Sequence, residues 1–168
     1  MSLHLALADY DGKQVATLEE IRDSRAPTPE VLDEVIRIST AADGHVAAGA
    51  TWLLRAWVEA GAVLTKSQMR ALTSRLPEVN DPWARLHLCQ TVRSLNVEPA
   101  HAEAFAGFLR SCRSSDRPFL RAWATDGLHA LASAHPEYGA EATEAVEDAL
   151  GDPAASVRAR ARRILDGR

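Results

Sequence analysis

Apolar residues recur along this chain with the period of an α-helix, and the pattern itself repeats about every 37 residues. In each repeat, an apolar residue is followed by others four and eight positions later, so the three side chains lie on one helical face. The four stripes are Val46, Ala50 and Leu54; Ala84, Leu88 and Val92; Leu120, Ala124 and Leu128; and Val157, Ala161 and Leu165. Units of this kind cannot bury their apolar faces alone, so they stack on their neighbours.

An earlier apolar helix precedes each stripe, so every repeat is predicted to be a pair of helices. The core positions of these first helices are Val35, Leu72, Leu109 and Val146, each 37 residues after the last. Positions three residues earlier are Leu32, Met69, Ala106 and Thr143, and those four residues later are Ser39, Leu76, Arg113 and Leu150. Helix starts are expected for the first helices at Thr28–Pro29, Thr65, Pro99 and Pro136. N-caps of the second helices are expected at Asp43, Asp81, Asp116 and Asp152.

Residues 1–26 do not follow the repeat. Val15, Leu18 and Ile21 predict one amphipathic helix. Leu3, Leu5 and Leu7 alternate with small or polar residues, and this segment fits either a short strand or a frayed turn. We interpret residues 1–26 as a cap over the first repeat of a repeat domain at residues 27–168, within a single domain overall.

Composition favours an ordinary soluble helical protein, with 46% hydrophobic and 25% charged residues. The net charge of -4 argues against a general polyanion binder and allows a local basic patch. Cys89 and Cys112 fall in predicted helices without a partner motif, which favours a reducing, cytoplasmic location. No apolar run approaches a membrane span, and the N-terminus lacks the features of a signal peptide, so we expect no membrane partner.

The second helices resemble those of HEAT repeats, in which an aspartate precedes a Val-Arg pair. Asp152, Val157 and Arg158 match best, and the likeness covers roughly residues 28–166; Ala47 replaces the arginine in the first repeat. The resemblance implies an all-α fold, a right-handed superhelical α-solenoid of about four HEAT-like helix pairs. It also implies a ladder of hydrogen bonds between adjacent repeats, formed by Asp81, Asp116, Asp152, Arg85, Arg121 and Arg158. It says little about activity, because HEAT proteins range from scaffolds to enzymes.

In solenoids of this kind the second helices line a concave surface. Positions six and nine residues after the start of each stripe point away from the core face, and they form two rows of polar and aromatic groups. With Trp123 at the margin, the candidate partner-binding residues are Trp52, Arg55, Gln90, Arg93, Trp123, Asp126, His129 and Arg163. Tryptophan and arginine are common anchors at protein interfaces. The alternative is a solvated face with one or two tryptophans packed against adjacent helices.

Two other tryptophans have structural interpretations. Trp57 aligns with core leucines of later repeats, and Trp83 is expected to pack at the turn between helices. Trp123 and Asp126, one helical turn apart, superficially resemble the tryptophan and aspartate in the groove of HEAT-like alkylpurine DNA glycosylases. The basic last helix, with Arg158 and Arg160 among its arginines, fits either a polyanion-binding end or an arginine-rich cap paired to nearby acids.

No phosphate loop, nucleophile elbow or metal-binding spacing occurs, so we expect no cofactor, no metal ion and no catalytic residue. The preferred hypothesis is a non-catalytic scaffold that holds a protein or peptide on its concave face. The alternative is a nucleic-acid-binding module or a DNA base-repair glycosylase. An accessory lyase or chaperone role, known for other HEAT-like proteins, has no residue here that specifies it. The oligomeric state stays open.

Overall fold

The computed structural model describes residues 2–42 and 44–167, and every regular element in that part of the chain is helical. The chain forms two compact units, residues 1–95 and residues 96–168. The expected all-α class is therefore confirmed. Asp43, the expected cap of the first stripe helix, lies outside the described residues.

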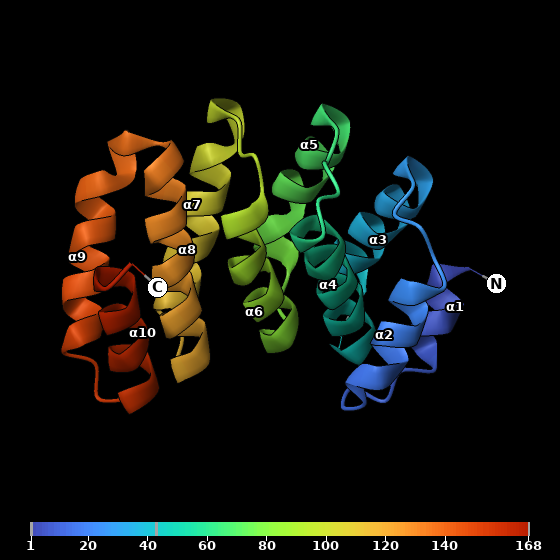
Figure 1. The fold of residues 1–168 in the computed structure, drawn as a ribbon, viewed down its shortest axis with the longest axis horizontal. Coiled ribbons are helices and arrows are strands. Elements are labelled where there is room, and N and C mark those ends of the chain that lie inside the picture. The colour runs from blue at the N-terminus through green and yellow to red at the C-terminus, as the bar shows by residue number, and fades with distance from the viewer. Residues whose placement is uncertain (1, 43, 168) are drawn as a thin grey trace. The chain divides into compact units, whose positions relative to one another are not determined.

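The first unit is coloured blue to yellow-green in Figure 1. Its helices are α1 (Leu3–Ala8), α2 (Val15–Asp23), α3 (Pro29–Ala41), α4 (Gly44–Glu59), α5 (Lys66–Arg75), the 3-10 turn η1 (Leu76–Glu78), α6 (Pro82–Thr91) and the 3-10 turn η2 (Val92–Ser94). Helix α3 packs against both α4 and α5, and α4 packs against α6. The first helices α3 and α5 thus contact each other, as do the second helices α4 and α6.

The second unit, coloured yellow to red in Figure 1, has the same kind of packing. Its helices are α7 (Pro99–Arg113), α8 (Pro118–Ala134), the 3-10 turn η3 (Pro136–Tyr138), α9 (Gly139–Leu150) and α10 (Ala155–Leu165). Helix α8 contacts α7, α9 and α10, and α9 also contacts α10. The second helix α8 of one pair therefore packs against both helices of the next pair.

The predicted helix starts hold best where a side chain caps the first turn. Thr28 and Thr65 accept hydrogen bonds from Val31 N and Gln68 N, and Asp81 accepts from Trp83 N and Ala84 N. The other starts follow proline: α7 has Pro99 in its first turn, and Pro136 opens the 3-10 turn η3 just before α9.

Two of the aspartate caps are wrong. Helix α8 begins at Pro118 after Arg117, because one extra residue separates Asp116 from the proline. Helix α10 begins at Ala155, two residues beyond Pro153. The Asp152 carboxylate there accepts a hydrogen bond from Ala154 N and two from Arg121, so it shapes the turn before the helix rather than capping it.

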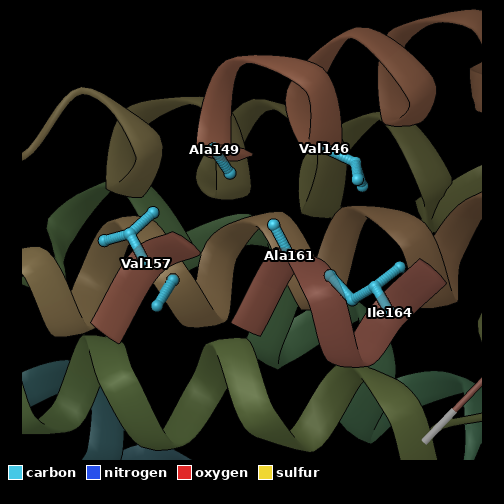
Figure 2. Close-up of a cluster of buried hydrophobic side chains, with 6 residues drawn as sticks. Val146, Ala149, Val157, Ala161 and Ile164 are labelled. Carbon is cyan, nitrogen blue, oxygen red and sulfur yellow. The ribbon is translucent and has the colours of Figure 1, made fainter. Parts of the chain in front are cut away.

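The predicted core stripes are buried except at two positions: Val46, at the start of the first stripe, is half-buried, and Leu165, at the end of the last stripe, is exposed. The middle residue of each stripe, four positions after the first, is at most 1% exposed. These residues are Ala50, Leu88, Ala124 and Ala161. Leu165 is 64% exposed, and the adjacent Ile164 is buried in its place. Figure 2 shows why: Ile164 joins Val157 and Ala161 of α10 in the cluster that faces Val146 and Ala149 of α9.

In the first helices too, the aligned positions are less completely buried in the last repeat. Val35, Leu72, Leu109 and Val146 are all buried. Thr143 and Leu150, which occupy the flanking positions in the last repeat, are exposed. Helix α9 therefore buries fewer of the aligned positions than α3 or α5.

The N-terminal segment packs closely on α4. Residues Leu3–Ala8 form a helix, so the expected strand or frayed turn is wrong: Leu3 and Leu7 lie one turn apart and are both buried. The predicted helix around Val15 is confirmed as α2. Gly49 of α4 permits the contact, since a Cβ there would lie 2.8 Å from Leu7 Cδ2.

Candidate partner-binding surfaces

A polar joint connects the second helices of unit 1. His87 of α6 reaches α4, where its Nδ1 lies 3.1 Å from both the Thr51 hydroxyl and the Ala48 carbonyl. The Thr51 hydroxyl also lies 2.9 Å from the Ala47 carbonyl, to which it can donate. Because a carbonyl only accepts, we assign the Nδ1 proton to the bond with Ala48. The ring thus bridges two helices from residues one repeat apart.

The joint keeps His87 neutral. Burial, with the positive charge of Arg55 as a smaller cause, lowers the pKa of His87 from 6.5 to about 4, although the bond to the Ala48 carbonyl acts in the opposite direction. A neutral imidazole with a backbone partner is a satisfied structural group. The geometry therefore gives His87 a packing role at this joint.

Four of the eight candidate residues lie on α4, α6 and η2 of unit 1. Arg55 donates a hydrogen bond to Gln90 and lies 3.6 Å from a Glu59 carboxylate oxygen. Trp52, one turn before Arg55 on α4, is half-buried, and Arg93, one turn after Gln90, is exposed. The structure thus brings Arg55 and Gln90 into direct contact and places Trp52 and Arg93 one turn away from them along the chain.

Trp52 has a neighbour that the repeat did not predict. The guanidinium of Arg22, from α2, lies 5.8 Å from the centroid of the Trp52 ring, within cation–π range. The side chain of Arg22 is 36% exposed. No periodic signal could reveal this contact, because α2 belongs to the N-terminal segment and has no counterpart in the repeats.

The other four candidates lie in unit 2, where two of them share one arginine. Arg160 of α10 stacks 3.7 Å from the ring centroid of Trp123, and its Nη1 lies 3.8 Å from Asp126 Oδ1. The Asp126 side chain is only 5% exposed. Trp123 and Asp126 are therefore joined through Arg160, and the carboxylate is not offered on an open surface as the helical wheel predicted.

His129 and Arg163 are exposed. Along their helices they follow Asp126 and Arg160 by one turn. They are the most exposed of the four candidates in unit 2. The neighbouring Arg162, which is not a candidate, is exposed as well.

Arginines at equivalent positions of two repeats make the same contacts. Arg121 Nη1 donates to the carbonyls of Ser115 and Asp116, six and five residues earlier. Arg158 Nη1 donates to the carbonyls of Asp152 and Pro153 at the same offsets. Each guanidinium thereby closes the turn that precedes its own helix.

One Asp–Arg bond of the implied ladder is present in unit 2. Arg121 forms a bidentate pair with Asp152 at 2.7 and 2.9 Å. The paired guanidinium lowers the pKa of the Asp152 carboxyl. Arg158, by contrast, binds carbonyls of the turn before its own helix. Since Arg160 contacts Trp123 and Asp126, two of the four arginines of α10 are engaged within the unit.

First helices of unit 2 are also joined by charges. Arg110 of α7 holds Glu141 of α9 through bonds of 2.6 and 2.8 Å and Glu103 through one of 2.7 Å. Tyr138 donates to Glu103, and Arg113 donates to Asp148. Hydrogen bonds from Arg110 lower the pKa of both glutamates, so the network is ionised at neutral pH.

The two tryptophans with structural interpretations behave differently. Trp57 is buried as predicted, at 3% exposure. Trp83 is 54% exposed, so it is only partly covered at the turn where packing is predicted. It occupies the first turn of α6 just after the Asp81 cap, where side chains point back past the helix end.

In the described part of the chain, no group of three or more histidine, cysteine, aspartate or glutamate side chains could hold a metal ion. None of the described helices is long and apolar enough to cross a membrane. Comparison of the chain with protein-family models, with curated proteins and with solved structures finds no match.

Proposed function

We propose that this chain is a non-catalytic HEAT-like α-solenoid scaffold that binds a protein or peptide partner through its second helices. The observation that carries the proposal is the cluster in unit 1, where Arg55 and Gln90 are bonded across α4 and α6, with Trp52 and Arg93 one turn away. A half-buried tryptophan beside arginines is the composition typical of interface hot spots.

The repeat assignment rests on contacts between residues one repeat apart. The joints described above link residues separated by 31 to 39 positions, as in Arg110–Glu141 and His87–Ala48. The shared carbonyl contacts of Arg121 and Arg158 support it further. Stacked units with nearest-neighbour contacts of this kind are the basis of solenoid stability.

Nucleic-acid binding and base repair have weaker support. Arg160 covers Trp123, and Asp126 is buried, so neither is disposed to receive a base. Engagement of Arg158 and Arg160 leaves fewer free cations on α10 than the phosphate contacts of a duplex binder require.

The test is a pull-down with tagged protein from nuclease-treated and untreated extract of the native host. We expect a protein partner that survives nuclease and is lost with Trp52→Ala/Arg93→Ala. The matched control is Trp83→Ala/Arg70→Ala, which removes an exposed tryptophan and an exposed arginine from the same unit but outside the cluster.

Arg93→Glu provides a second variant, because Arg93 is exposed, and its melting temperature is measured beside its partner binding. Partner loss with Arg93→Glu at an unchanged melting temperature would support the surface. Equal retention by all variants, or recovery of nucleic acid in place of protein, would refute it.

A further inference from the structure

A groove between the first helices α3 and α5 of unit 1 is independent of the proposed partner surface. Its volume is about 380 Å³, and its lining comprises Asp33, Ile36, Arg37, Thr40, Ser67, Gln68, Ala71 and Arg75. Figure 1 shows the two helices in blue and green, and they contact each other directly. Each of the two helices supplies four of these lining residues.

One end of the groove is closed by a buried amide. Gln68, 3% exposed, donates from Nε2 to the Pro29 carbonyl and to Asp33 Oδ1. Its own Oε1 accepts from Thr65 N. These bonds join the N-terminal ends of both helices, so α3 and α5 run in the same direction. Positions farther along each helix therefore line the open end.

Two guanidiniums lie toward that open end. Arg37 of α3 and Arg75 of α5 line the groove together with Thr40. The acids nearest to Arg37 in the chain are engaged elsewhere: Asp33 accepts from Gln68, and Glu34 accepts from Leu3 N. Among the described residues, Arg37 has no ion-pair partner.

Within the described part of the chain, Arg75 pairs with its near neighbour Glu78 alone. It lies 3.3 Å from Glu78, and the side chains are 46% and 57% exposed. Exposed pairs of this type contribute about 0–1 kcal/mol and exchange partners easily. The groove thus has two like charges on opposite walls, with no carboxylate of the described chain bridging the two helices at that level.

The corresponding first helices of unit 2 also carry arginines, at other positions of the repeat, and there each arginine binds a carboxylate of the neighbouring first helix. Arg110, at the position that Ile36 has in the repeat, binds Glu141 across α7 and α9, and Arg113 binds Asp148. Carboxylates therefore bridge the first helices in unit 2. In unit 1 the bridge joins the Gln68 amide to the Asp33 carboxylate at the other end of the groove, and it involves no arginine.

From this contrast we infer that the α3–α5 groove binds a carboxylate-bearing side chain of a peptide partner, held by Arg37 and Arg75. Planar guanidiniums match a carboxylate in geometry as well as charge. Ile36 and Ala71 supply apolar contact for the methylene groups of the same side chain. Asp33 repels a second anion at the closed end, which disfavours polyanions such as nucleic acid.

The experiment is an NMR titration of the ¹⁵N-labelled full chain, followed through the arginine Nε–Hε signals. The probe is N-acetylglutamate α-amide, which carries one side-chain carboxylate, and its match is N-acetylglutamine amide, which carries none. We expect the glutamate probe to shift the signals of Arg37 and Arg75 and the glutamine probe to leave them in place.

Arg37→Gln should weaken the binding about tenfold, as expected for loss of one charge-assisted hydrogen bond. The control Arg70→Gln alters an exposed arginine of α5 that does not line the groove, and it should leave the affinity unchanged. Equal shifts with both probes, or an undiminished affinity of Arg37→Gln, would overturn the inference. Tighter binding of inorganic phosphate at these arginines would overturn the assignment to a carboxylate.

Discussion

The two units join their repeats with different chemistry. In unit 1 the second helices meet through Thr51 and His87 and through Arg55 and Gln90, so each contact has at least one neutral member. In unit 2 the contacts are mostly ion pairs, including Arg121–Asp152 and Arg110–Glu141. Similar helix packing therefore does not require similar polar contacts.

The difference follows from where the polar groups lie. His87 is buried enough to lose its charge, and a neutral ring with a carbonyl partner avoids the cost of burying an ion. The Arg121–Asp152 pair is partly exposed, at 20% and 12%, so both groups remain ionised and hydrated on one side. Each unit should respond to its own perturbation.

The largest effect is expected from Ala161→Asp in unit 2. Ala161 is fully buried in the cluster between α9 and α10, and an unpaired carboxylate there should cost at least about 4 kcal/mol. Hydrogen exchange should show loss of protection in α9 and α10, whereas α3 and α4 of unit 1 stay protected.

Ala159→Asp is the matched control, because Ala159 is exposed on the same helix. It should change stability by less than about 0.5 kcal/mol. Loss of protection in unit 1 together with unit 2 would show that the units unfold as one, and an unchanged melt of Ala161→Asp would contradict the core assignment.

A fall in pH should affect the units in sequence. The folded pKa of His87 is about 4, against 6.5 for the ordinary group, so the unfolded chain binds a proton that the folded chain excludes. Unit 1 should therefore lose stability as pH falls from 6.5 to 4, by up to about 3 kcal/mol. The lowered pKa values of Asp152 and Glu141 imply that unit 2 loses stability only as pH falls below the unfolded values of these carboxyls, at and below about 4.5.

Thermal melts at several pH values, followed by amide signals of α4 and α8, measure both responses. His87→Asn keeps a donor for the Ala48 carbonyl and removes the imidazole, so the pH dependence of unit 1 should disappear between 6.5 and 4. His4→Asn, a change at an exposed histidine of α1, should preserve it. Identical pH profiles for the two units would remove the contrast drawn between their joints.

Sequence periodicity predicted the interior of the repeats better than their ends or joints. Ala50 and Ala124 were placed correctly because burial on a helix follows a fixed angular period. Asp116 was misplaced as a cap because one additional residue in a turn shifts the helix start without altering the period. Arg160 over Trp123 depends on two helices whose mutual register is set by packing, and no single-helix pattern contains it.

The smallest expected effect concerns the N-terminal segment, which unit 2 does not have. Gly49→Ala would place a Cβ 2.8 Å from Leu7 Cδ2 and 3.2 Å from side-chain atoms of Leu18 and Tyr10, so the Leu7 side chain must shift and its two neighbours must give way slightly. We expect a loss of about 1–2 kcal/mol, because overpacking exceeds the gain in helix propensity of alanine.

The matched control is Gly107→Ala in α7, whose new Cβ meets nothing within 4 Å, so it should instead stabilise unit 2 by about 0.5–1 kcal/mol. Hydrogen exchange that loosens α1 and α2 while α5 and α6 stay protected would show that the segment is an added layer on the repeats. Stabilisation by both substitutions would mean that the close contact at Gly49 does not hold the segment in place.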